Sequence, residues 1–236
     1  MPLILNIETS SDICSVSLSK GENTISIKET KENNSHSKLL TILIEEILFE
    51  NNIKINDVDA IAVSEGPGSY TGLRIGVSTA KGICYALNKP LIAVNTLQSL
   101  AINIFENSNL KQLPQKEKKN ILICPMIDAR RMEVYTGFFD INYKIKKEIK
   151  ADIITSDSYK DILSEHIVLF GGSGAEKCKD IIRNEKAFFI QDISFSAKYM
   201  TKISSAAYFK SEFVNTAYFE PFYLKEFIAG VPKKLF

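Results

Sequence analysis

The feature that most constrains this chain is a loop rich in glycine and proline, placed between an apolar run and a long helical pattern. The apolar run is Val58–Val63, and the loop, Gly66–Gly72, leads into a predicted helix over Thr71–Leu87. Ser69 or Thr71 is expected to cap this helix, and the glycines permit a tight turn and a close approach to a neighbouring backbone. The segment predicts a strand-to-helix turn, with a phosphate site at the helix N-terminus as the alternative.

Two nucleotide-binding motifs fail on spacing in this loop. A P-loop requires a lysine after its second glycine, and Gly68–Leu73 contains none. A dinucleotide fingerprint would place its third glycine at Thr71, and the acidic residue expected after the next strand is missing, since Val94 is followed by Asn95. Neither motif therefore explains the loop.

The rest of the pattern alternates strands with helices and indicates the α/β class. Further strands are predicted at Leu3–Glu8, Ile13–Ser19, Thr24–Glu29, Leu91–Val94, Ile121–Ile127, Met132–Phe139 and Ile167–Phe170, and further helices at His36–Asn51 and Ser204–Phe213. The polar stretch Glu106–Asn120 predicts a boundary between an N-terminal lobe, 1–105, and a C-terminal lobe, 106–236. The closing helix, at about 204–213, is assigned to the second lobe, with packing against the first lobe as the alternative.

Composition narrows the class of protein. The chain has 236 residues, 45% hydrophobic content and a formal net charge of +1, so no global charge advertises nucleic acid or a membrane surface. Four cysteines are scattered without a Cys-x-x-Cys motif and are expected to be buried thiols. Glu8 interrupts the apolar N-terminus, and no stretch is long enough to span a bilayer. We expect a cytoplasmic protein with no membrane partner.

Three segments together resemble the TsaB family, the non-catalytic partners in bacterial tRNA threonylcarbamoyladenosine formation. They are Ile4–Asp12, Gly66–Gly76 and Val94–Leu100, which occur in this order in that family; Asp128–Arg130 and Pro221–Leu224 are weaker matches. The resemblance implies a two-lobed, actin-like and sugar-kinase-like ATPase (ASKHA) fold. It also implies a complex with a TsaD-like catalytic paralogue and a TsaE-like ATPase, with tRNA reached mainly through that complex.

Departures from the TsaD pattern suggest a scaffold rather than an enzyme. TsaD-like proteins hold a metal with a His-x-x-x-His pair, whose positions here are Thr96 and Leu100. Leucine offers no lone pair, and a threonine hydroxyl is a poor ligand for a transition metal. The only histidines, His36 and His166, are far apart in the sequence. We therefore assign no catalytic residue and no metal site.

A vestigial nucleotide site is expected at four positions implied by the fold: Thr9 and Ser10 in the phosphate-loop position, and Gly171 and Gly172 on the adenosine side. The loop lacks the acidic residue and glycine of kinase members, so we expect no tightly bound cofactor and only weak ATP binding. Two alternatives remain open at this point, an ATP-binding phosphotransferase of the same fold and a glycoprotease-like metallopeptidase.

The two long helices independently suggest a partner. On His36–Asn51 the apolar residues cover an arc of about 180°, wider than the stripe of about 100° that a surface helix needs. Thr71–Leu87 has two apolar sides, and a helix enclosed by its own fold is the alternative explanation. The predicted interface comprises Leu39, Leu43, Ile47, Leu73, Arg74, Gly76, Val77 and Ala80. Without its partner, the chain is expected to form a homodimer through the same surface.

A basic run remains unassigned by these arguments. It comprises Lys144, Lys146, Lys147 and Lys150, with Lys116, Lys118 and Lys119 in the predicted linker. Such runs are usually solvated faces, and salt-sensitive contacts to tRNA are the alternative.

Overall fold

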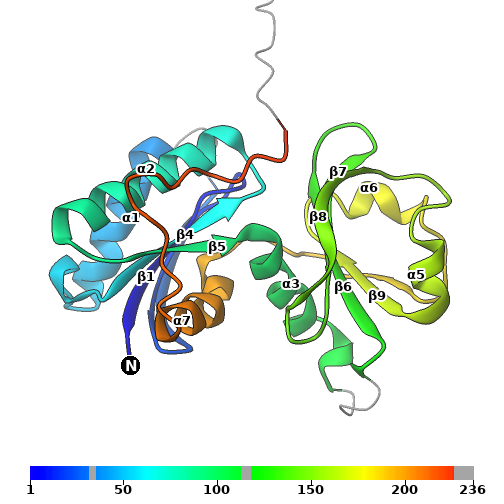
Figure 1. Cartoon of the computed structure of the whole chain (residues 1–236), viewed down its shortest axis with the longest axis horizontal. Helices are drawn as coiled ribbons and strands as arrows, with labels where there is room; N and C mark the ends of the chain where they lie inside the picture. Colours follow the sequence, from blue (N-terminus) through cyan, green and yellow to red (C-terminus); the bar gives the residue numbers. More distant parts are fainter. Residues whose placement is uncertain (32–35, 113–117, 226–236) are drawn as a thin grey trace, which may run out of the picture.

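A computed structural model describes residues 1–31, 36–112 and 118–225. Two five-stranded mixed sheets form the centres of two lobes that lie side by side (Figure 1). Within the described residues, no helix combines the length and the apolar character that a membrane crossing requires.

The first sheet has the order β3-β2-β1-β4-β5. Its strands are β1 (Leu3–Glu8), β2 (Cys14–Lys20), β3 (Asn23–Thr30), β4 (Ala60–Gly66) and β5 (Leu91–Asn95). The chain starts as the predicted meander, with β1 antiparallel to β2 and β2 antiparallel to β3. β4 and β5 then add in parallel, because a helix connects each of them to the preceding strand.

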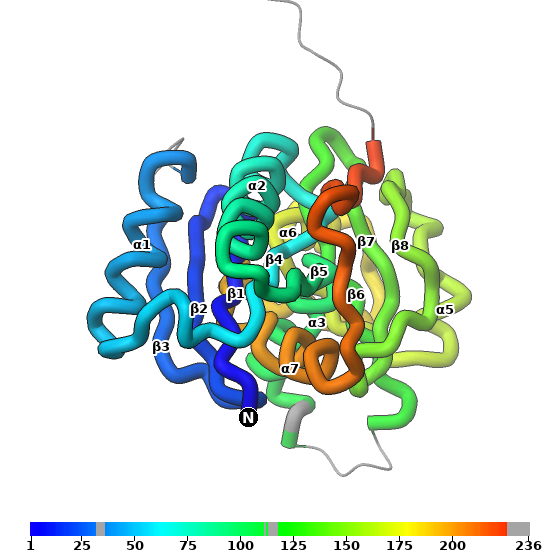
Figure 2. Tube along the Cα trace, turned by 60° about the vertical axis from the view of Figure 1, so that its left-hand side comes forward, coloured from blue at the N-terminus to red at the C-terminus, as the bar shows by residue number. Residues whose placement is uncertain are grey.

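Two helices cover one face of this sheet. α1 (His36–Glu50) and α2 (Tyr70–Leu87) run beside each other on that face (Figure 2). Their inward side chains join a core with β1, β2 and β4, which includes Ile47 and Val77. The remaining apolar stripe of the sheet is covered from the other side by the short helix η3 (Ala197–Met200) and by α7 (Thr201–Phe209).

Polar side chains attach the returning η3–α7 segment to the first sheet. The Ser17 hydroxyl donates to the Ala197 carbonyl at 3.0 Å, and the Ala197 amide donates to Ser15 Oγ at 2.9 Å. The Ser204 hydroxyl donates to Asn6 Oδ1 at 2.7 Å. These buried groups are matched to one another, so they add specificity to a contact that also has an apolar core.

The second sheet has the order β10-β9-β6-β7-β8. Its strands are β6 (Ile121–Asp128), β7 (Glu133–Phe139), β8 (Ile145–Ile153), β9 (Ile167–Gly171) and β10 (Ala187–Phe189). Short helices α5 (Lys160–Glu165) and α6 (Glu176–Lys179) lie on one face. The short turns η1 (Ile55–Asp57) and η2 (Asn109–Gln112) complete the elements of the described chain.

Helix α3 (Thr96–Glu106) joins the two lobes. It starts at the end of β5, where Asn95 Oδ1 accepts the amides of Leu97 and Gln98 at 3.1 and 3.2 Å. Although its sequence precedes the predicted boundary, its buried side packs on β6, β7 and β9 of the second sheet. Helix α3 therefore follows the last strand of the first sheet in sequence but belongs to the core of the second lobe.

The C-terminal segment, residues 213–225, makes a second connection from the first lobe to the second. Val214 forms an isolated bridge with Leu91 of β5, its amide donating to the Leu91 carbonyl at 2.9 Å. The segment then follows α2 (Figure 2) and reaches the second sheet, where Lys225 pairs with Glu133 of β7.

Candidate functional site

The loop after β1 is enclosed by the start of α2. Three glycines, Gly68 in the loop before α2 and Gly72 and Gly76 in α2, contact this loop directly. A Cβ at Gly72 would lie 2.0 Å from the Thr9 carbonyl oxygen, and one at Gly68 would lie 2.4 Å from the Ser10 carbonyl oxygen. Ser69 caps α2, as one of the two predicted candidates, and its amide donates to the Ser10 carbonyl at 2.7 Å. The start of α2 and the loop before it therefore pack directly against the backbone of Thr9 and Ser10.

A buried carboxyl group closes the same loop. Glu8 is 1% exposed, and its Oε1 accepts the Ser10 amide at 2.6 Å. Burial raises the pKa of Glu8 above its ordinary value of 4.5, against the opposing effect of hydrogen bonds from Ser10 and Ser64. The hydroxyls of Thr9 and Ser10 have no hydrogen-bond partner among the described residues. The loop thus encloses polar groups that the chain's own hydrogen bonds do not fully satisfy.

The two glycines expected on the adenosine side are also covered. A Cβ at Gly171 would lie 2.7 Å from Ile104 Cγ1 of α3. One at Gly172 would lie 2.6 Å from the Met126 carbonyl oxygen of β6 and 2.8 Å from Leu100 Cδ2 of α3. Gly172 has φ 103°, a conformation that glycine adopts without strain. These glycines therefore serve the packing of α3 on the second lobe.

A narrow space between the lobes leaves no room for the centre of a water-sized sphere. It is lined by Glu8, Thr96, Ser99, Leu100, Asn103, Ser194, Phe195, Ser196 and Tyr199. Thr96 and Leu100, which stand where TsaD-like proteins have their histidine pair, thus line this interlobe space. No group of three metal-ligating side chains occurs among the residues that the structure describes.

The predicted interface residues are mostly part of the chain's own core. Buried in the first lobe are Leu43, Ile47, Leu73, Val77 and Ala80, and Gly76 is packed against Thr9. Leu39 is half-buried. A side chain enclosed by its own sheet cannot contact a partner, so the apolar arc of α1 and this side of α2 are core. This resolves the choice that the two-sided periodicity left open.

The opposite sides of α1 and α2 face outward. We define the outer helix surface as Ile42 and Phe49 of α1 together with Ser78, Gly82, Tyr85 and Ala86 of α2. Phe49 is 82% exposed and Tyr85 is 88% exposed. The sequence signal for this surface was the second apolar side of the later helix, which carries Gly82 and Ala86.

Arg74, the remaining predicted interface residue, is exposed but engaged by the C-terminal segment. Its guanidinium lies 4.1 Å from the centre of the Tyr70 ring, and its Nε donates to Tyr223 Oη at 3.3 Å. The Phe222 amide donates to the Glu65 carbonyl at 2.7 Å and fixes the segment to β4. Arg74 therefore holds Tyr223 of the C-terminal segment over the start of α2.

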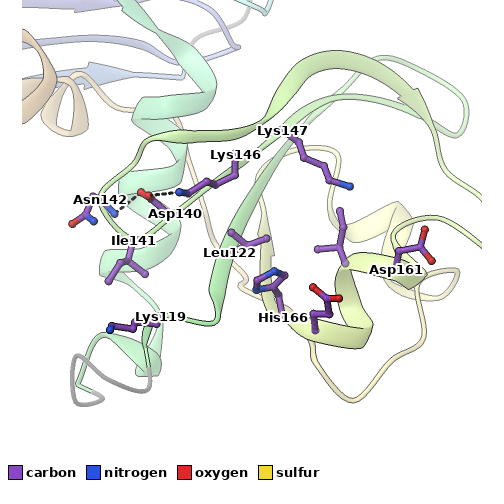
Figure 3. A pocket seen from close by; sticks show the side chains of 11 residues that line it. Lys119, Leu122, Asp140, Ile141, Asn142, Lys146, Lys147, Asp161 and His166 are labelled. Atoms are coloured by element: carbon purple, nitrogen blue, oxygen red, sulfur yellow. Dashed lines mark hydrogen bonds and ion pairs between the residues drawn. The ribbon is translucent and has the colours of Figure 1, made fainter.

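A larger hollow, of about 740 Å³, lies in the second lobe (Figure 3). Its walls are Lys119, Leu122, Asp140, Ile141, Asn142, Lys146, Lys147, Asp161, Ile162, Glu165 and His166. Part of the basic run is neutralised here, since Lys146 pairs with Asp140 at 3.3 Å, while Lys150 pairs with Asp152 at 3.1 Å. Lys116 lies outside the described residues.

The two lobes, each a mixed sheet flanked by helices, define a protein of the actin-like, sugar-kinase-like ASKHA class. A family described as "TsaD: tRNA N6-adenosine threonylcarbamoyltransferase" matches residues 26–229. A solved structure described as an uncharacterised protein with similarity to peptidase YEAZ from Pseudomonas aeruginosa superposes with a TM-score of 0.80 at 23% identity, covering 95% of this chain and 100% of that one.

Two curated relatives narrow the assignment within this class. A "tRNA threonylcarbamoyladenosine biosynthesis protein TsaB" of Buchnera aphidicola subsp. Baizongia pistaciae is 30% identical over 94% of this chain and 98% of its own length. The protein of the same description from Haemophilus influenzae is 28% identical over 94% and 93%. The chain belongs to the TsaB family, and the resemblance found in the sequence is confirmed.

Proposed function

We propose that this chain is a non-catalytic scaffold subunit of the complex that transfers a threonylcarbamoyl group to adenosine next to the anticodon of tRNA. Its partner would be a TsaD-like catalytic paralogue, bound through the outer helix surface, with a TsaE-like ATPase as a further component. Support comes from membership of a family whose curated relatives are described as threonylcarbamoyladenosine biosynthesis proteins.

The observation that carries the proposal is the position of Gly82. This glycine lies in the interior of α2, where glycine costs about 0.5–1 kcal/mol relative to alanine. A Cβ at Gly82 would meet nothing within 4 Å, whereas one at Gly76 would meet Thr9. The packing within this chain therefore requires a glycine at position 76, whereas it would accommodate a larger side chain at position 82. Close approach of an external helix explains why the second glycine is useful.

Neighbouring residues fit such a helix contact. Ser78, Gly82 and Ala86 recur every four residues, so these small side chains share the exposed side of α2. Tyr85 of α2 and Phe49 of α1 add large exposed rings, and aromatic side chains supply much of the binding energy in protein interfaces. Without the paralogue, two copies would associate through the same surface about a two-fold axis.

The two alternatives have less support. A phosphotransferase of this fold would use the loop at Thr9 and Ser10, which lacks the acidic residue and glycine of kinase members. A metallopeptidase needs ligands at Thr96 and Leu100. We accordingly propose no tightly bound cofactor, and nucleotide binding by the isolated chain weaker than about 100 μM, or about 5.5 kcal/mol. Calorimetry with ATP and magnesium tests this, and a low-micromolar affinity would revive the phosphotransferase.

Calorimetric titration of the chain with the TsaD-like paralogue from the same cell tests the scaffold proposal. Gly82→Arg should weaken binding by at least about 100-fold, or about 2.8 kcal/mol, because the side chain would hold the helices apart. Ile153→Arg is the matched control, since Ile153 is 67% exposed on β8 in the other lobe. Light scattering on the chain alone should show a dimer that Gly82→Arg converts to a monomer.

Equal affinity of the two variants for the paralogue would reject the outer helix surface as the interface. Circular dichroism provides the folding check, because Gly82 faces open space and its replacement leaves the core intact.

A further inference from the structure

The turn between β6 and β7 holds two arginines in an unfavourable backbone conformation. Arg130 and Arg131 have φ 71° and 48°, both in the left-handed region. For residues other than glycine and asparagine this conformation costs roughly 1 kcal/mol or more each. Two consecutive left-handed residues at a hairpin turn are usually glycine, asparagine or aspartate. Arginine is therefore an unfavourable residue for the backbone conformation at both positions.

A lysine holds this turn from behind. Lys177 of α6 donates to the carbonyl oxygens of Arg131 and Glu133 at 2.6 and 2.8 Å, and it also pairs with Asp128. The Arg130 amide donates to Asp128 Oδ1 at 2.9 Å. The Lys177 ammonium therefore binds the backbone of the turn at two carbonyl groups and holds the turn in one conformation.

The acidic groups near the turn form ion pairs with lysines rather than with the arginines, although the charge of Arg130 also acts on Asp128. Asp128 pairs with Lys177, and Glu133 pairs with Lys225 of the C-terminal segment. Arg130 and Arg131 are exposed, and neither guanidinium makes a hydrogen bond or an ion pair with a described residue. The turn thus presents two adjacent cations outward on a rigid support.

We propose that Arg130 and Arg131 bind phosphate groups of the tRNA backbone in the assembled complex. This inference rests on the proposed function, which makes tRNA the substrate of that complex. Guanidinium groups match phosphate oxygens bidentately, and backbone contacts of this kind set the position of an RNA without reading its sequence. The pair lies on the second lobe, away from the apolar outer helix surface on the first lobe, so both surfaces can be occupied together.

The test uses the complex of this chain with its paralogue and an unmodified tRNA transcript. Arg130→Gly combined with Arg131→Gly removes the charges while relieving the backbone. Binding should weaken about tenfold at 100 mM salt, and the slope of log K against log salt should fall by about 1.5, because two phosphate contacts are lost. The thermal midpoint of this variant should be equal to or above that of the wild type.

A second variant, Arg130→Lys with Arg131→Lys, keeps the charge and removes the planar fork. It should retain the salt slope and lose part of the affinity. Removing two exposed charges elsewhere, with Lys20→Gln and Lys179→Gln, serves as the control for net charge and should leave the slope within about 0.5 of the wild type.

Unchanged tRNA affinity and slope in the glycine variant would overturn this inference alone. Loss of paralogue binding instead of tRNA binding would also overturn it and would indicate an acidic protein surface as the ligand. A wild-type complex that forms but does not bind tRNA would contradict the inference, whereas failure of the chain to bind the paralogue would contradict the proposed function itself.

Discussion

Gly76 and Thr9 are packed so closely that a Cβ on Gly76 would lie 2.2 Å from Thr9 Oγ1. This contact joins the middle of α2 to the loop after β1, and it explains why a helix interior contains a glycine that costs helix propensity. It also makes Gly76 a residue of the fold rather than of the partner surface.

The first prediction follows from this contact. Gly76→Ala should destabilise the chain by about 1–3 kcal/mol, because the added methyl group overpacks a site filled by the side chain of Thr9. Combining it with Thr9→Ala should recover much of the loss, since the nearest remaining atom, the Thr9 Cβ, stands 3.3 Å away. Urea unfolding of the two single variants and the double variant measures this coupling.

Gly82→Ala is the matched control six residues along the same helix. With open space around the new methyl group, it should stabilise the chain by about 0.5–1 kcal/mol. Equal effects at Gly76 and Gly82 would contradict the assignment of one side of α2 to the core and the other to the surface.

The second prediction concerns pH and Glu8. Burial raises the folded-state pKa of Glu8 above its ordinary 4.5, so the folded chain binds the proton more strongly than the unfolded chain. The stability from this group is complete below about pH 4.5 and is lost as the pH rises through the folded-state value. Glu8→Gln should therefore flatten the fall in thermal midpoint above pH 4.5, because the amide oxygen can still accept the Ser10 amide. A steeper fall in the variant would show that Glu8 is ionised in the folded chain.

The third prediction concerns the cap that joins the lobes. Asn95→Ala should cost about 0.5–2 kcal/mol, because two amides at the start of α3 lose their acceptor. It would also remove the hydrogen bond to Glu65 Oε1 at 3.2 Å. Asn95→Asp keeps the cap but places a second carboxyl beside Glu65, so its deficit should shrink as the pH is lowered. Chemical denaturation at pH 5 and pH 8 separates these effects, and a pH-independent deficit for Asn95→Asp would argue against contact with Glu65.

The fourth prediction concerns the four free cysteines, all of which are buried as expected. Burial raises the pKa of Cys14 and Cys84 to about 11, so the reactive thiolate is scarce at neutral pH. A thiol reagent at pH 8 should label the folded chain slowly and the urea-unfolded chain at four sites per molecule. Rapid labelling of any one thiol under native conditions would reveal local opening of its lobe.

Local patterns predicted most elements because they depend on neighbours in sequence. The meander, the strand before the loop and the helix capped by Ser69 all follow from periodicity and capping residues. β8 was missed because it pairs with one neighbour only and is largely exposed, so Lys146, Lys147 and Lys150 made it resemble a solvated charge run.

Contacts between distant segments set the parts of the site that periodicity could not resolve. The sequence does not show which apolar side of α2 is core, whereas the packing of Gly76 on Thr9 and the burial of Val77 and Ala80 do. In the same way, the sequence does not show that Gly172 packs against the Met126 carbonyl oxygen and Leu100. Close approach of backbones leaves glycines in a sequence without indicating which neighbour they accommodate.

The most direct test of the scaffold account is the yield of threonylcarbamoyladenosine in tRNA as the chain is titrated into a reconstituted system. Gly82→Arg should raise the concentration needed for half-maximal yield by about 100-fold and leave the yield at saturation unchanged. Glu8→Gln, inside the closed interlobe space, should match the wild type at every concentration. Loss of yield at saturation with Glu8→Gln, together with a wild-type curve for Gly82→Arg, would contradict the account and place chemistry between the lobes.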